Sequence, residues 1–284
     1  MIRLDAATVL LQWAAGGLLF LWVTSRRRVV GIGYGWLLRS VFLVLAVGAF
    51  VVGRAVDPAP VREAGSVGVA VAAGAALVVS VVRRRAGVRG EHATRARRSA
   101  RVAAMTGSDR PPAAADEAAA EFPPLLDLVA PALGAVGLVG AALHAGGPAA
   151  LAVARTLVGA AFLGAVSDAM LLGHWYLVQP GLGRWPLSEL SRWASIIWPA
   201  EVGLLLWPTG MLSVLSGRID DGYDGMLGWF WIACALTTIG LTFVTRAALK
   251  ERSYSAVMAA TGLLYLAILT AFGTDLVARA VLAG

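Results

Sequence analysis

Eight stretches of this chain are apolar over a length that can cross a lipid bilayer. A membrane-spanning helix needs about 20 mostly apolar residues, and inside a bilayer only helices and closed barrels satisfy their backbone hydrogen bonds. We therefore predict an all-α integral membrane protein, a bundle of about eight transmembrane helices with the lipid bilayer as its main partner. The predicted spans are residues 6–24, 30–52, 65–82, 125–145, 149–178, 193–215, 226–249 and 255–282.

The composition supports this class. Only 14% of the 284 residues are charged and 58% are hydrophobic, whereas a soluble domain carries about 25% charged residues. The single cysteine, Cys234, excludes a disulfide within the chain and thiolate sites for zinc or iron–sulfur clusters. No metal site is expected.

The basic residues gather in alternate connections between the spans. Such clusters beside membrane spans are typical of cytoplasmic loops that fix the orientation, so we expect no nucleic-acid partner. The pattern predicts a multi-pass protein of the cell (plasma) membrane with its N-terminus and C-terminus both outside. The basic connections are residues 26–28, 83–101, 184–192 and 246–252.

One long connection divides the chain. Residues 83–121 are Arg-rich and then Ala/Pro-rich, with too few large apolar residues to build a core. We expect a cytoplasmic linker between a three-span N-terminal segment, residues 1–82, and a five-span C-terminal segment, residues 122–284, which carries the candidate site.

Ionisable side chains inside the predicted spans are the strongest indication of a site, because charge in a membrane is costly and usually functional. Arg39, Asp168 and Glu201 fall at similar predicted depths in the cytoplasmic half, and His174 lies near the cytoplasmic interface. Asp168, His174 and Glu201 are the candidate catalytic residues, since carboxylates and imidazole take up or relay protons near neutral pH. The alternative is a structural ion pair, because a buried Arg needs a carboxylate in any protein.

The residues expected to bind a substrate surround these groups. Most of them come from the segment 167–181, in which Gly173 would admit a neighbouring helix or a flat ligand, and aromatic side chains suit the membrane interface. The candidate binding residues are Arg39, Met170, Trp175, Tyr176 and Trp198.

Two further features complete the prediction. Pro199 and Pro208 lie in the sixth span and each removes a backbone donor, so this span should be proline-kinked or broken. Towards the outside, Arg155 is expected to pair with Asp275 or Arg279, mainly in a structural role.

Three functions fit these observations. The first is a membrane subunit of a respiratory or redox complex that binds quinone near the cytoplasmic interface and works with redox partner subunits. Haem is the less favoured cofactor, because His144 and His174 lie at opposite depths and cannot clamp one haem. The alternatives are a proton-coupled transporter or channel that uses a buried Arg/Asp/Glu cluster, and a non-catalytic membrane assembly or scaffold protein. Motifs of nucleotide-binding and hydrolytic enzymes are absent.

Overall fold

The computed structural model describes residues 4–88, 92–93, 96, 99–100, 104–105, 120–179, 181–208, 210–251 and 253–283. Most of the predicted linker therefore lies outside the described residues. Within the described part, the long helices are α1 (Ala6–Ser25), α2 (Ile32–Val56), α3 (Pro60–Val82), α5 (Val129–Ala145), α6 (Ala149–Trp175), α7 (Trp185–Leu206), α9 (Met226–Ala248) and α10 (Tyr254–Val281). Shorter elements are the 3-10 turns η1 (Arg83–Ala86) and η2 (Pro124–Leu128) and the helix α8 (Met211–Leu215).

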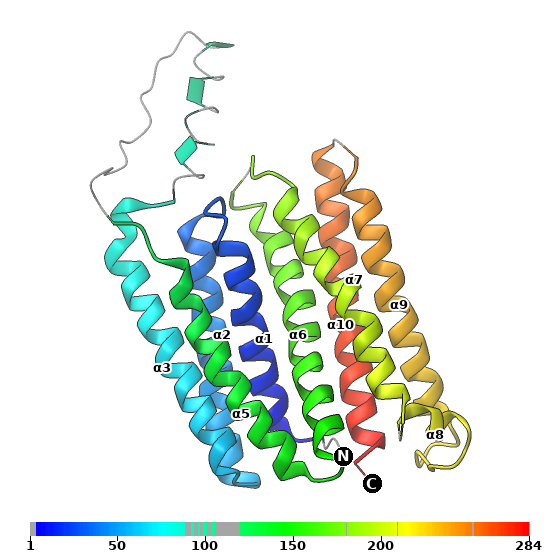
Figure 1. Cartoon of the computed structure of the whole chain (residues 1–284). Helices are drawn as coiled ribbons and strands as arrows, with labels where there is room; N and C mark the ends of the chain where they lie inside the picture. Colours follow the sequence, from blue (N-terminus) through cyan, green and yellow to red (C-terminus); the bar gives the residue numbers. More distant parts are fainter. Residues whose placement is uncertain are drawn as a thin grey trace.

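The long helices run up and down as neighbours in one bundle (Figure 1). Both chain ends lie at the same end of the bundle, which we call the termini end. The opposite end, which we call the linker end, carries the α1–α2, α6–α7 and α9–α10 connections and the flanks of the linker. The described parts of the basic connections named above therefore share one end of the molecule, as the sequence predicted.

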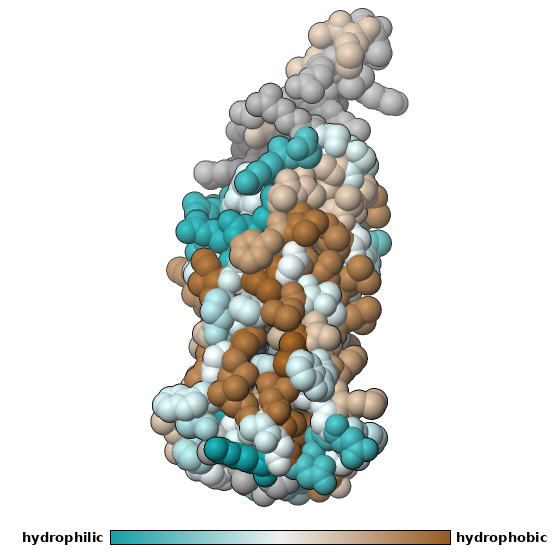
Figure 2. Space-filling model, turned by 90° about the vertical axis from the view of Figure 1, so that its right-hand side faces the viewer, coloured by the Kyte–Doolittle hydropathy of each residue, from teal (hydrophilic) through white to brown (hydrophobic). Residues whose placement is uncertain are grey.

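The surface of the bundle is suited to lipid. Seven of the described helices are long and apolar enough to cross a membrane, namely α1, α2, α3 with η1, η2 with α5, α6, α9 and α10. Large apolar side chains such as Val44, Val71, Leu236 and Leu269 are more than half exposed. Figure 2 shows hydrophobic residues in a band between two hydrophilic ends on one side of the bundle. The chain is a multi-pass helical membrane protein.

The predicted sixth span needs correction. We expected residues 193–215, whereas α7 begins at Trp185 and ends at Leu206, just before Trp207-Pro208. The earlier start has a local reason: Pro186 occupies the first turn, where its missing N–H costs nothing. The helix continues through Pro199, and α7 is too polar to be counted among the seven apolar helices.

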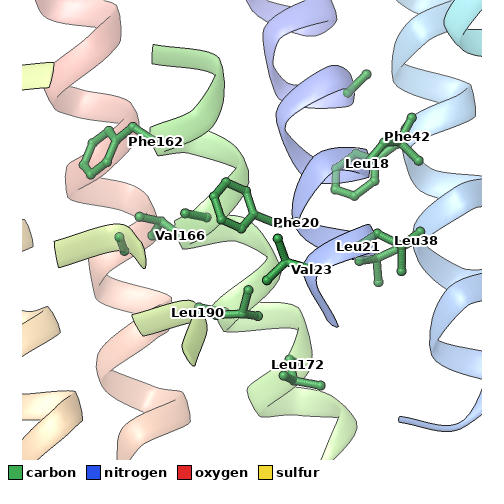
Figure 3. Close-up of a cluster of buried hydrophobic side chains, with 14 of the residues drawn as sticks. Leu18, Phe20, Leu21, Val23, Leu38, Phe42, Phe162, Val166, Leu172 and Leu190 are labelled. Atoms are coloured by element: carbon green, nitrogen blue, oxygen red, sulfur yellow. The ribbon is translucent and has the colours of Figure 1, made fainter. Parts of the chain in front are cut away.

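The core is centred on α1, which packs against α2, α5 and α6. Figure 3 shows Leu18 and Leu21 of α1 beside Leu38 and Phe42 of α2, and Phe20 on the side of α6. The three N-terminal helices and the five C-terminal ones thus share one continuous core, although a linker separates them in the sequence.

A glycine contact sets the distance between α1 and α6. A Cβ atom on Gly16 would collide with the backbone carbonyl of Ala160, and Gly164 is packed against Gly16 in the same way. Small residues permit such close approach between helices in membranes, where packing and hydrogen bonds replace the hydrophobic effect. The polar groups on α1 and α6 are thereby brought into one buried layer.

Candidate functional site

The expected meeting of Arg39 with Asp168 and Glu201 does not occur. The guanidinium of Arg39 donates from Nε and Nη2 to the two carboxylate oxygens of Asp127, both at 2.8 Å, and its Nη1 lies 3.3 Å from the Ser80 hydroxyl. Both members of the Arg39–Asp127 pair are buried, with side chains 3% and 1% exposed. Arg39 is therefore held in an ion pair between α2 and η2, and its charge is already matched.

Asp168 is fully buried on α6 at a distance from that pair. Neither carboxylate oxygen has a hydrogen-bond partner among the described residues. The nearest polar contact is to its backbone, where the Tyr34 hydroxyl donates to the Asp168 carbonyl at 3.2 Å. An unpaired carboxylate at this depth is costly when ionised, so Asp168 is a candidate for proton binding.

His174 points elsewhere. It is exposed on α6, and its Nδ1 lies 3.3 Å from the hydroxyl of Tyr265 on α10, which is also exposed. Because six residues separate Asp168 from His174, the two side chains fall on different faces of the helix. The structure does not bring these two candidate catalytic residues together.

The candidate binding residues around them have structural partners. Trp175 donates to Gln179 at 3.0 Å and lies near the ring of Tyr34, while the buried Tyr176 donates to the carbonyl of Gly183 at 2.6 Å. Met170 is partly buried against the core.

Trp198 lies apart from all of these residues. Its indole N–H donates to the Ala235 carbonyl at 3.0 Å and thereby joins α7 to α9. Among the candidate binding residues, those at the linker end of α6 and Trp198 on α7 thus line no common site.

Glu201 lies in the termini-end half of the bundle, in the layer where we expected only Arg155, Asp275 and Arg279. The shift follows from the true start of α7: Glu201 is 16 residues from Trp185, which is about 24 Å along the helix. Asp275, Arg279 and Arg155 are the charged groups that act on Glu201. The predicted outer pair is therefore part of a larger buried group.

The centre of this group is Gly159 on α6. A Cβ atom at that position would lie 2.9 Å from Nε2 of Gln12, 3.1 Å from Oδ1 of Asp275 and 3.6 Å from Oε1 of Glu201. Three helices, α1, α7 and α10, thus direct polar side chains at a position where α6 has no side chain. We call Gln12, Arg155, Glu201, Asp275 and Arg279 the Gly159 cluster.

The two arginines of the Gly159 cluster are anchored within it. Arg279 donates from Nε to Oδ2 of Asp275 at 2.7 Å, one helical turn away. Arg155 donates from Nε to the Leu204 carbonyl at 2.8 Å. That carbonyl is free because its usual partner four residues later is Pro208, which has no N–H. The proline that ends α7 thus helps to place Arg155.

The acceptors of the Gly159 cluster are less well satisfied. Both carboxylate oxygens of Glu201, Oδ1 of Asp275 and Oε1 of Gln12 are buried and have no hydrogen-bond partner among the described residues. All three residues are at most 1% exposed. Buried acceptors are normally paired, so unpaired acceptors gathered beside Gly159 indicate that bound protons satisfy them.

A small pocket at the termini end adjoins the Gly159 cluster. Its polar lining residues are Asp5, Thr8, Asp57, Arg62, His144, Thr156 and Arg279. Arg279 belongs to both the pocket and the cluster, and the Thr156 carbonyl accepts a hydrogen bond from Gln12 at 2.8 Å. The pocket therefore meets the cluster at Arg279.

Sequence reasoning missed two of the residues that define these sites. Asp127 lies inside the predicted fourth span, at the same end as Arg39, so its charge was a signal that could have identified the partner of Arg39. Gln12 carries no charge and gave no comparable signal. For metal binding, no group of three or more His, Cys, Asp or Glu side chains suited to an ion occurs within the described ranges.

No family model, curated protein or solved structure matches this chain.

Proposed function

We propose that this chain is a proton-coupled transporter or channel of the plasma membrane, and that Glu201 is its proton-binding residue. The observation that carries the proposal is the buried Glu201 carboxylate beside Gly159, neither of whose oxygens has a hydrogen-bond partner among the described residues. Ionised carboxylates without partners are costly in a low-dielectric core, and protonation removes that cost. Neighbouring carboxylates also share protons readily, because like charges disfavour each other.

The route of the proton follows α6. We place the entry at the termini end, where a small polar pocket adjoins the cluster at Arg279. Towards the linker end, Asp168 supplies a second unpartnered carboxylate on the same helix, nine residues after Gly159. That separation is about 14 Å along the helix, so transfer between the two needs water or a conformational change.

The orientation of the route is part of the proposal. In this proposal the bundle crosses the membrane eight times, because α7 spans it together with the seven apolar helices. The basic linker end then faces the cytoplasm. Glu201 would then receive protons from outside. Fusion of a reporter enzyme active only outside the cytoplasm to the C-terminus tests this orientation, and activity of the reporter is the expected result.

The proposed function is tested with purified protein in liposomes that contain a pH-sensitive dye. An imposed pH gradient, with potassium and valinomycin to balance charge, should drive proton flux above that of empty liposomes. Glu201→Gln keeps the shape but not the titrating group and should reduce the rate by roughly 100-fold. Glu251→Gln, which removes an exposed carboxylate at the linker end, is the matched control and should leave the rate unchanged. Wild-type flux equal to that of empty liposomes, or equal flux through the Glu201 variant, would refute the proposal.

A quinone-binding subunit of a redox complex is the second candidate. The observation in its favour is the exposed pair of His174 and Tyr265, in hydrogen-bonding distance on the lipid-facing side of α6 and α10. A quinone carbonyl dissolved in the bilayer could reach both groups. The two functions are separated by gentle purification from the native membrane, followed by extraction of quinone and identification of co-purifying subunits. Quinone that is bound to the wild type and lost from His174→Ala would favour the quinone-binding subunit.

A further inference from the structure

A cleft at the linker end separates α7 from α9. Its α7 wall includes Trp185, Glu189 and Arg192, and its α9 wall includes Phe243 and Arg246. Lys250, two residues after α9, and Arg27, two residues after α1, complete the rim. Nearer the middle of the bundle the two helices are joined by the hydrogen bond from Trp198 to Ala235. The cleft is therefore open at the interface and closed towards the centre.

The charge of this cleft is strongly positive. Four cationic side chains line it against one carboxylate, and that carboxylate, Glu189, is engaged by Arg26 at 2.5 Å. Arg192, Arg246 and Lys250 have no ion-pair partner within the part of the chain that the structure describes. Three like charges held around one cleft repel each other unless an anion lies between them.

The surroundings of the cleft are those of a membrane interface. Trp185 and Phe243 are 42% and 56% exposed, and Arg27 lies over the Trp185 ring at 5.9 Å. Below them, exposed apolar side chains continue towards the middle of the membrane, with Ile196 on α7 and Leu236 on α9. A soluble phosphate compound would gain nothing from this apolar continuation, whereas the acyl chains of a lipid would lie along it.

We propose that the α7–α9 cleft is a binding site for the headgroup of an anionic phospholipid. The phosphate lies among Arg192, Arg246 and Lys250, and the acyl chains follow the apolar surface of α7 and α9. Basic pockets between transmembrane helices on the cytoplasmic side bind such headgroups in general. The size of the cleft and its excess of cations favour a headgroup with two phosphates over one with a single phosphate. The lipid would fill the space between the linker-end parts of the two helices, and so hold α7, the helix of Glu201, against α9.

The test uses the full chain in mixed micelles and native mass spectrometry. Increasing amounts of phosphatidylglycerol or of a bis-phosphate phospholipid are titrated in, with phosphatidylcholine as the zwitterionic comparison. Arg192→Gln/Lys250→Gln removes two exposed cations of the cleft and should weaken retention of the anionic lipid about thirtyfold. Arg84→Gln/Arg85→Gln removes two exposed cations at the same end but away from the cleft, and should bind as the wild type does.

The outcomes decide the proposal. Selective retention of anionic lipid that only the cleft variant loses supports it. Equal loss in both variants would mean that the lipid responds to overall charge, and equal retention in both would place the lipid elsewhere; either result overturns the site. Displacement of the lipid by millimolar inorganic phosphate alone would assign the cleft to a soluble anion instead. The size-exclusion profile and melting temperature in zwitterionic detergent verify that each variant is folded.

Discussion

Removal of the Asp127 carboxylate should be one of the most damaging single substitutions in this protein. The Arg39–Asp127 pair is bidentate, with two N–O distances of 2.8 Å, and is almost completely buried. Asp127 also accepts a hydrogen bond from Ser25 at 3.0 Å, so it links α1, α2 and η2. Asp127→Asn leaves the Arg39 guanidinium buried without a counter-charge, which costs about 3–5 kcal/mol.

The exposed ion pair of Arg54 and Glu63 provides a control for the stability loss expected of Asp127→Asn. Arg54 and Glu63 approach to 3.4 Å, but the Arg54 side chain is 63% exposed. A pair of this kind contributes about 0–1 kcal/mol, so Arg54→Gln should have little effect. Equilibrium unfolding in mixed micelles titrated with sodium dodecyl sulfate, followed by tryptophan fluorescence, measures both variants under the same conditions.

A double replacement tests whether charge pairing is the cause. Arg39→Met/Asp127→Leu removes both charges and fills the space with apolar atoms, so it should regain most of the lost stability. The reasoning is refuted if Asp127→Asn costs no more than Arg54→Gln. It is also refuted if the double replacement is as unstable as Asp127→Asn, because the loss would then come from packing and not from the unpaired charge.

Two further predictions concern packing and pH. Gly16→Val should prevent α1 from approaching the Ala160 carbonyl and abolish the monodisperse peak on size exclusion, whereas Gly203→Ala, whose Cβ meets nothing within 4 Å, should behave as the wild type does. In the loop before α9, partial desolvation raises the pKa of Asp221, but the backbone N–H groups of Tyr223, Gly225, Leu227 and Gly228 outweigh it and hold the pKa below its ordinary value of 3.8. The pKa of Asp221 is lower in the folded loop than in the unfolded chain. The stability that its hydrogen bonds give the loop is therefore complete above the ordinary pKa and is lost as the pH falls through the folded pKa. Amide exchange should show protection decreasing in that acidic range, and Asp221→Asn should have faster exchange at neutral pH; equal protection in the variant would contradict this.

The predicted helices show how far a local pattern reaches. Residues 6–24 were predicted as the first span and α1 is Ala6–Ser25, because an apolar run between Asp5, which caps the helix, and three arginines fixes both ends. The sixth span was misplaced by eight residues at its start. Its first turns carry Glu189 and Arg192, and they are helical because Pro186 favours a helix start and because the α7 side chains pack in the bundle.

The same error moved Glu201 into the wrong half of the membrane. Depth was counted from the expected start at Trp193, so Glu201 was assigned to the layer of Arg39 and Asp168. Counted from Trp185, it belongs with Arg155, Asp275 and Arg279, which the sequence indicated as buried charges without adding Glu201 to them.

The sequence by itself determined the class of this protein, its alternation of basic and non-basic ends and the residues whose charge is unusual for their position. These follow from local composition, because a bilayer demands apolar length and charge is conspicuous within it. Only the tertiary structure decided which charges meet. Whether Arg39 pairs with Asp127 or Asp168 depends on helix rotation and neighbour order, and whether Gln12 lies beside Asp275 depends on the close contact of α1 with α6 at Gly16. Such contacts join residues more than 80 positions apart, and no local pattern encodes them.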